Sequence, residues 1–214
     1  MSGAARARPI GFLAYPGVEE LDLVGPWEIA TMWRDYAGGP ECLVVAAHPG
    51  EIPCAKGLSI TARHGFDDAP ALSVLVVPGG FAAFEVMKDA ATLDYVRRAA
   101  AQADHVMSVC SGAFVLAATG LLAGKRATTH WKAIGALRDA GIDVVEERFV
   151  QDGNVWTSAG VSAGVDLMLQ FIARTQGDDT ADVVAHNAEY YPDPRPFGDR
   201  HKGAGMPAYM RRLP

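Results

Sequence analysis

The residue best placed for covalent chemistry in this sequence is Cys110. The segment His105-Val-Met-Ser-Val109 predicts a strand, and an apolar, alanine-rich stretch over 112–122 predicts a helix directly after it. A side chain at such a strand–helix corner points toward the open edge of a parallel sheet, where clefts form. Unpaired N–H groups at a helix start favour a thiolate. We therefore expect Cys110 to be a reactive nucleophile, the alternative being a buried structural cysteine.

Two glycines and a serine are the candidates for stabilising negative charge beside this cysteine. Pro78-Gly79-Gly80 ends a second apolar run, and Ser111 follows the cysteine. Glycine lets backbone amides approach a ligand closely, so an amide of this loop and that of Ser111 would form an oxyanion hole. Pro-Gly-Gly alone indicates only a turn. The proposed role in binding depends on the loop lying next to Cys110.

Asp22 is the candidate acid. It lies between two leucines and shortly before Gly25-Pro26, which is an unusual place for a solvated charge. A carboxyl that is partly desolvated has a raised pKa suited to proton transfer. The competing interpretation is that Asp22 is a helix cap or a turn residue.

Alternating β-branched runs and helical stretches must position these residues. This alternation predicts an α/β fold with a doubly wound, mainly parallel sheet, helices on both faces and a late β-hairpin. We expect one domain over 1–214, with its core at about 8–192 and a proline-rich C-terminal tail, 193–214, without regular structure. Strands are expected over 10–15, 41–46, 73–77, 105–109, 143–150 and 155–158, and helices over 28–36, 89–103, 112–122 and 162–175, with a further helix that begins near Thr129 as N-cap.

Composition narrows the class of protein. Half of the 214 residues are hydrophobic and the net charge is −6, which argues against a nucleic-acid partner. The three cysteines, Cys42, Cys54 and Cys110, have no C-x-x-C spacing, so neither a disulfide framework nor a zinc site is expected. No apolar run is long enough to span a bilayer, and the N-terminus lacks the apolar segment of a signal peptide. We expect a cytoplasmic protein with no membrane partner.

Four motifs in this order resemble the ThiJ/PfpI superfamily, whose relatives include class I glutamine amidotransferase-like proteins. They are Asp22-Leu-Val-Gly-Pro26, Val77-Pro-Gly-Gly80, Val109-Cys-Ser-Gly112 and Ala127-Thr-Thr-His-Trp131, and the resemblance covers about residues 8–192. Within the superfamily the chain is most similar to the isocyanide hydratases. The resemblance implies a flavodoxin-like fold, a homodimer and no cofactor or metal. It assigns the chemistry to residues matching Cys110 and Asp22.

The activity implied is a lyase reaction, the hydration of an isocyanide to an N-substituted formamide through a covalent thioimidate. Ser111 departs from relatives that place a histidine after the cysteine. His130 matches a histidine near the nucleophile in the wider superfamily, either as an accessory group or as a helix-start residue that orients its loop. Apolar Phe81, Phe84, Val86 and Trp131 would line a hydrophobic pocket or pack in the core.

Two alternative functions remain open. A glyoxalase-like hydratase of 2-oxoaldehydes, or a stress-response protein, would use a glutamate near the first strand, and Glu19 and Glu20 precede Asp22. A non-catalytic ligand-sensing domain related to AraC-type regulators would share the fold. Such regulators carry a helix-turn-helix region after the sensor, which is not expected here. Trp27 and Trp33 would supply a dimer interface or part of the core.

Overall fold

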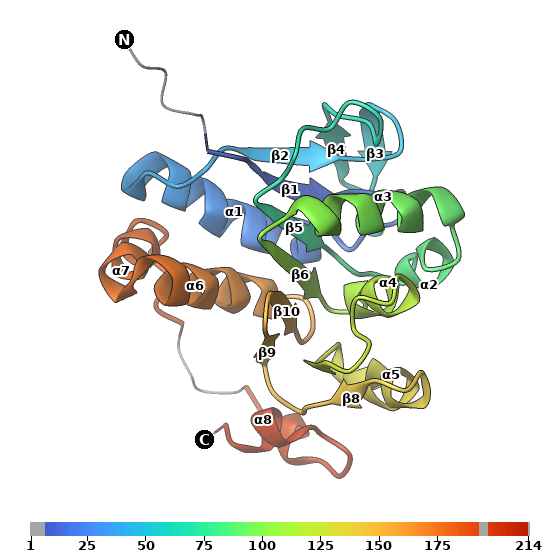
Figure 1. Ribbon diagram of the computed structural model, residues 1–214. Coiled ribbons are helices and arrows are strands. Elements are labelled where there is room, and N and C mark those ends of the chain that lie inside the picture. Colours follow the sequence, from blue (N-terminus) through green and yellow to red (C-terminus); the bar gives the residue numbers. More distant parts are fainter. Residues whose placement is uncertain (1–6, 193–196, 214) are drawn as a thin grey trace.

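A six-stranded sheet forms the centre of the computed structural model, which describes residues 7–192 and 197–213. The strand order is β2-β1-β5-β6-β10-β9, and every neighbouring pair is parallel except β10 and β9 (Figure 1). The prediction of a flavodoxin-like, doubly wound sheet is therefore confirmed. The strands are β1 (Ile10–Leu13), β2 (Cys42–Val45), β5 (Val74–Val77), β6 (His105–Val109), β9 (Phe149–Asp152) and β10 (Val155–Ser158).

Helices cover both faces of this sheet. Successive side chains of a strand point to opposite faces, so Ile10 and Phe12 of β1 join one hydrophobic cluster and Leu13 joins the other. On one face lie α1 (Glu20–Ala37), α6 (Ala163–Gln176) and α7 (Asp178–Asn187), and on the other α2 (Ala83–Val86), α3 (Ala90–Gln102) and α4 (Gly112–Ala118), as Figure 1 shows. Asp89 caps α3 by accepting the Thr92 N–H at 2.9 Å.

Helix α1 begins at Glu20, eight residues before the expected start at Glu28. Gly25 and Pro26 lie inside it rather than ending a loop, because they pack against α6. A Cβ on Gly25 would lie 3.2 Å from Val165, and one on Gly164 would lie 3.0 Å from Pro26. The close packing that small residues allow at this helix crossing stabilises the helix by more than the missing backbone hydrogen bond at Pro26 costs. As a result, Asp22 lies in the first turn of a helix.

The connection after β2 contains elements that the sequence did not predict. A hairpin of β3 (Gly50–Pro53) and β4 (Ser59–Ala62) forms a separate two-stranded sheet. The expected strand over 143–150 is divided into β8 (Asp143–Val144), which pairs with β7 (Arg126–Ala127), and β9. The predicted late hairpin is confirmed as β9–β10. It belongs to the main sheet, because β10 pairs with β6.

The C-terminal part differs from the prediction in two ways. Helix α7 follows α6 and was not among the predicted helices. The tail contains a 3-10 turn, Arg200–Lys202, and the short helix α8 (Ala208–Arg211), whereas residues 193–196 and 214 of the expected coil lie outside the described residues. The Ala208 N–H donates to Glu146 Oε2 at 3.0 Å, which holds α8 against the loop before β9.

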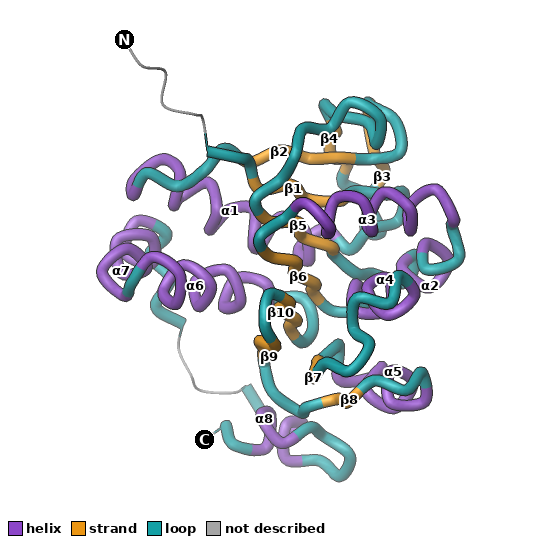
Figure 2. Tube along the Cα trace, viewed as in Figure 1, coloured by secondary structure: helices purple, strands orange, loops and turns teal. Residues whose placement is uncertain are grey.

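Four loops leave the sheet at the carboxyl ends of β1, β5, β6 and β10. The strand order places β1 and β5 side by side although β2 follows β1 in sequence, which creates the change of direction where clefts form in such folds. Figure 2 shows the loops after β5 and β6 leading into α2 and α4. Within the described residues, no helix is long and apolar enough to cross a membrane.

Candidate active site

Cys110 occupies a sharp turn between β6 and α4. Its φ angle is +58°, in the left-handed region that residues other than glycine rarely adopt, and the residue is 7% exposed. Its N–H donates to the Ala159 carbonyl at 3.0 Å, and its own carbonyl accepts the Thr129 hydroxyl at 2.8 Å. A Cβ on Gly112 would lie 2.2 Å from the Val77 carbonyl oxygen, so only glycine fits the next helical position. The sequence prediction of a strained strand–helix corner at Cys110 agrees with this geometry.

Asp22 lies against the cysteine in the first turn of α1. Its side chain is fully buried, and Oδ2 accepts the Gly79 N–H at 3.0 Å. The Cys110 thiol lies close enough to favour the ionised form of the carboxyl, whereas Oδ1 has no hydrogen-bond partner among the described residues. Burial acts more strongly than Cys110 and the Gly79 N–H, and it raises the pKa of the carboxyl to about 7. Asp22 can therefore both hold and release a proton near neutral pH.

The Gly79-Gly80 loop holds the other side chains of the site rather than offering free amides. The Gly79 N–H is bonded to Asp22, and the Gly80 N–H donates to Ser111 Oγ at 2.9 Å. The Ser111 hydroxyl in turn donates to the Gly80 carbonyl at 2.8 Å. Because both loop amides already have acceptors, the structure argues against an oxyanion hole built from them. Their role is to position Asp22 and Ser111.

The glycines are required for this close packing. A Cβ on Gly79 would lie 2.5 Å from the Ser111 nitrogen and 2.8 Å from Asp22 Oδ2. Gly80 has a φ angle of +114°, and a Cβ there would approach the Glu19 nitrogen to 2.7 Å. Any side chain at either position would push apart the groups that the loop brings together.

Two other backbone amides face the sulfur. The N–H groups of Ser111 and Val161 hydrogen-bond to Cys110 Sγ and stabilise its thiolate. Burial and the adjacent Asp22 carboxylate act more strongly in the opposite direction and raise the pKa of the thiol to about 12. The helix start favours the thiolate, as expected, but burial and Asp22 outweigh it, so the resting thiol is protonated. An attack by the sulfur would require the loss of this proton, and Asp22 is the adjacent group that can take it.

Val161 is a site residue that the sequence did not reveal. It has a φ angle of +45°, which is rare for a β-branched residue. Arg148 holds the surrounding loop: its carbonyl accepts the Ala159 N–H at 2.9 Å, and its guanidinium donates to Ser162 Oγ at 3.3 Å. The same guanidinium donates to Asp166 on α6 at 2.6 Å. Val161 contributes a backbone amide, so its residue type carried no chemical signal.

Tyr15 is a second residue that sequence reasoning did not assign to the site. Its hydroxyl donates to the carbonyls of Pro78 and Gly79, at 2.7 and 3.0 Å. Burial, followed by the nearby charges of Asp22 and Cys110, raises the pKa of Tyr15 well above its ordinary value. Tyr15 therefore remains protonated and fixes the loop that positions Asp22.

His130 lines the same hollow as Cys110, at the start of a 3-10 turn, Trp131–Ala133. Its Nδ1 accepts the Lys132 N–H at 3.3 Å, so His130 rather than Thr129 is the capping residue. The ring packs on Gly160, where a Cβ would lie 2.2 Å from Cδ2. Burial, reinforced by the Lys132 charge, lowers the pKa of the imidazole. These contacts agree with an orienting role for a neutral His130.

Glu20 does not join the cysteine. Its carboxylate accepts the backbone N–H of Lys56 at 2.6 Å and that of Leu58 at 3.5 Å, so it holds the β3–β4 connection. Burial opposes its ionisation, yet the backbone N–H groups outweigh burial and lower the pKa of the carboxyl. Glu19, its neighbour, lines the hollow and pairs with the Lys56 ammonium. Glu20 therefore has a structural role here, which corrects its candidacy as an accessory residue of the site and as the glutamate of a glyoxalase-like site.

The hollow above Cys110 has a volume of about 470 Å³. Its apolar wall includes Phe81 and Phe84, as expected, whereas Val86 and Trp131 pack against the core and do not line it. Phe81 is 90% exposed and stands at the rim. The complete lining is Glu19, Lys56, Gly80, Phe81, Phe84, Cys110, Ser111, His130, Lys132, Ala133, Ala136 and Val161.

Comparison with known proteins gives close relatives for this arrangement. An isonitrile hydratase of Pseudomonas putida is 42% identical over 193 residues, which cover 89% of this chain and 82% of that protein. The HTH-type transcriptional regulator CdhR of Pseudomonas aeruginosa is 31% identical over 81% of this chain, but the match spans only 52% of the regulator. A crystal structure of a ThiJ/PfpI family protein from Pseudomonas syringae superposes with a TM-score of 0.85 at 35% identity, covering 96% of this chain and 83% of that one.

A family model describes most of the chain as well. The model of the DJ-1/PfpI family matches residues 8–174, which include Asp22, the Gly79-Gly80 loop, Cys110 and Val161. This match confirms the resemblance inferred from the four sequence motifs. The chain therefore belongs to the DJ-1/PfpI family.

Proposed function

We propose that this protein is an isocyanide hydratase that converts R–NC and water to the formamide R–NH–CHO. The observation that carries the proposal is the buried Asp22 carboxyl beside the Cys110 thiol, while His130, which lines the same hollow, accepts the Lys132 N–H instead. The 42% identity to the isonitrile hydratase of Pseudomonas putida supports the same activity. Side chains and water are sufficient for the reaction, so the proposal requires no cofactor.

The first half of the reaction adds the thiol across the isocyanide carbon. The Cys110 proton passes to the Asp22 carboxylate as the sulfur attacks the terminal carbon of R–NC, which is electrophilic. Asp22 then delivers that proton to the same carbon, giving the thioimidate R–N=CH–S–Cys110. A carboxyl whose pKa is about 7 accepts a proton from the thiol more readily than one at the ordinary value of 3.8, and it can return that proton to carbon. The amides of Ser111 and Val161 stabilise the sulfur while it carries negative charge.

The second half hydrolyses this intermediate. Asp22, again a carboxylate, takes a proton from water as the hydroxyl adds to the thioimidate carbon, and it passes that proton to the nitrogen. Collapse of R–NH–CH(OH)–S–Cys110 breaks the carbon–sulfur bond and returns the hydroxyl proton to the sulfur. The products are R–NH–CHO and the resting Cys110 thiol, so one water is consumed for each isocyanide.

Formation of N-cyclohexylformamide from cyclohexyl isocyanide tests this proposal. Cys110→Ala should abolish turnover, and Asp22→Asn should lower kcat by about 10²-fold or more because it removes the proton carrier. Cys54→Ala is the matched control, since Cys54 lies in the β3–β4 connection and does not line the hollow. Substantial turnover by Cys110→Ala would contradict the covalent mechanism.

The glyoxalase-like alternative is less well supported, because Glu20 is engaged by the amides of Lys56 and Leu58 rather than by the cysteine. Methylglyoxal assayed beside cyclohexyl isocyanide separates the two activities. The sensor alternative predicts ligand binding without turnover by the wild-type chain. Either result, methylglyoxal hydration alone or binding alone, would contradict the hydratase.

We also propose that the protein acts as a homodimer in the cytoplasm. Family resemblance supports a dimer, but the two tryptophans considered for its interface pack inward. Trp33 is buried, and Trp27 meets Phe12 edge-on with ring centroids 5.2 Å apart. Exposed apolar residues of α1, Leu21 and Val24, are better placed for contact with a second copy. Sedimentation equilibrium of the wild-type chain measures its oligomeric state directly.

A further inference from the structure

The hollow above Cys110 is lined by both apolar and charged side chains. Cys110 at the floor is 7% exposed, and the wall contains the aromatic ring of Phe84 and the side chains of Ala133 and Ala136. The lining also includes three charged side chains, those of Glu19, Lys56 and Lys132. A ligand that fills this space can therefore contact the thiol, the apolar side chains and the charged side chains of the lining.

Two of these charges neutralise each other. Lys56 pairs with Glu19, whose side chain is only 16% exposed, so this ion pair contributes little net charge. Lys132 differs, because within 7–192 and 197–213 no carboxylate lies at ion-pair distance from its ammonium. Its Nζ lies 5.3 Å from the centroid of the Trp131 ring. The lining thus presents one cation whose charge no protein carboxylate among the described residues neutralises.

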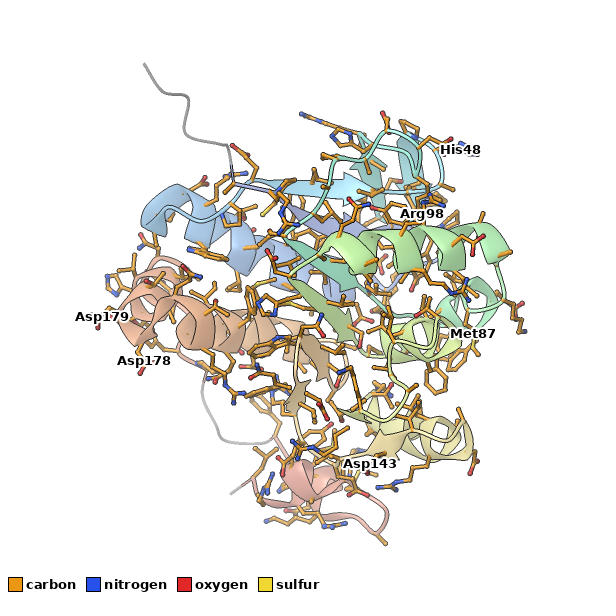
Figure 3. The ribbon with its side chains drawn as sticks, viewed as in Figure 1. His48, Met87, Arg98, Asp143, Asp178 and Asp179 are labelled. Atoms are coloured by element: carbon orange, nitrogen blue, oxygen red, sulfur yellow. The ribbon has the colours of Figure 1, made fainter. Side chains whose placement is uncertain are left out.

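This local positive charge contrasts with the net charge of the whole chain, which is −6. Acidic residues such as Asp178 and Asp179 lie at the beginning of α7, on the opposite side of the molecule from α2 (Figure 3). An unpaired lysine beside a partly apolar cavity is suited to an anionic group on a ligand, because such a cavity excludes part of the screening water.

We propose that the preferred substrates are isocyanides that carry a carboxylate at the end away from the isocyano carbon, and that Lys132 binds this carboxylate. The inference rests on the proposed hydratase function and adds the chemical class of the R group. The isocyano carbon lies at Cys110, the apolar body of R contacts Phe84 and the alanines, and the carboxylate reaches the ammonium. Binding of the remote group acts mainly on KM, since it is the same in the ground state and in the transition state.

Matched substrates test this specificity. The two compounds are para-isocyanobenzoate and its methyl ester, which keeps the ring and removes the charge, and the specificity constant kcat/KM is measured for each. The wild-type ratio of acid to ester should exceed one, and Lys132→Met should lower that ratio by about fivefold through KM, as expected for one partly screened ion pair. Lys88→Met is the control: it removes a lysine that pairs with Glu85 and does not line the hollow, so the ratio should stay at its wild-type value.

Alkylation of Cys110 provides a second readout that does not require isocyanide turnover. The reagents are para-(iodoacetamido)benzoate and its methyl ester, and the labelled Cys110 peptide is quantified by mass spectrometry. The acid-to-ester ratio of labelling rates should also fall in Lys132→Met and not in Lys88→Met. A ratio that is unchanged in Lys132→Met, in either assay, overturns the carboxylate site. If the labelling ratio falls but no isocyanide is hydrated, the anion site stands and the hydratase function is wrong.

Discussion

The two sides of the Cys110 sulfur are built in different ways. On one side, side chains and glycine amides pair with one another: Gly79 donates to Asp22 at 3.0 Å and Gly80 to Ser111 at 2.9 Å. On the other side, a single backbone amide of Val161 faces the sulfur from a left-handed conformation. The first side depends on which residues are present. The second depends on a backbone shape that neighbouring residues must maintain.

We call the side of the sulfur with Asp22, Ser111 and the Gly79-Gly80 loop the paired side, and the side with Val161 the backbone side. The largest loss of stability should come from a substitution that crowds the paired side. Gly79→Ala places a methyl group 2.5 Å from the Ser111 nitrogen and 2.8 Å from Asp22, so this loop must move. We expect the free energy of unfolding to fall by about 1–3 kcal/mol, as for other overpacked sites. Formamide production should fall as well, because displaced Asp22 no longer meets the thiol. Thermal denaturation and the cyclohexyl isocyanide assay measure the two effects.

Gly135→Ala is the matched control for this substitution. Gly135 lies within α5 (Ile134–Asp139), and a Cβ there meets no atom within 4 Å. Alanine should therefore stabilise the helix by roughly 0.5–1 kcal/mol, the opposite sign to Gly79→Ala. Equal effects at both positions would show that the close packing of the Gly79 loop is unimportant.

Asp22 should make stability depend on pH. Its pKa is raised from an ordinary value of 3.8 to about 7 by burial, so the folded chain holds this proton more tightly than the unfolded chain. The resulting stabilisation is complete below about pH 4 and is lost as the pH rises toward 7. Relative to Asp22→Asn, the wild-type chain should lose up to about 1.4 kcal/mol per pH unit across this window.

Urea unfolding of both chains at several pH values measures this difference. The Asp22→Asn variant should become the more stable of the two above pH 7, because it contains no carboxylate to bury. Parallel stability curves for the two chains from pH 4 to pH 8 would contradict the assignment of Asp22 as a desolvated acid.

The paired side was predictable from the sequence, and the backbone side was not. Cys110, Asp22 and Ser111 act through side chains, and their types and positions after predicted strands indicated a site. Val161 acts through its N–H, which every residue except proline possesses, so its identity carries no information. Even on the predictable side, hydrogen-bond partners required coordinates: the Gly79 amide holds an acid and is not free to bind an oxyanion.

The fold shows a similar division. The buried strand over 105–109 was predicted with its bounds because five residues alternate between two packed faces. The start of α1 was predicted too late because Gly25 and Pro26 are poor helix formers, and only their contact with α6 explains their place inside it. Local propensity cannot report such a contact between segments distant in sequence.

The smallest of these effects should come from loosening the backbone side. Arg148 holds the Val161 loop through its guanidinium, which donates to Ser162 and Asp166. Arg148→Gln removes the bond to Asp166 and should let Val161 relax, so that its amide leaves the sulfur. Loss of one hydrogen bond to the thiolate should slow iodoacetamide alkylation of Cys110 by about three- to tenfold and shift its pH profile upward.

Arg97→Gln is the matched control, because Arg97 is similarly exposed and pairs with Asp94 within α3, away from the loop. Its alkylation profile should coincide with that of the wild-type chain. Arg148→Lys keeps the charge but loses the fork that spans Ser162 and Asp166, so an intermediate profile is expected. If Arg148→Gln and Arg97→Gln gave the same profile while both were folded, the conformation of Val161 would be maintained by the loop itself. The two sides of Cys110 would then differ only in their hydrogen-bonding groups, and not in how much support they need from the rest of the fold.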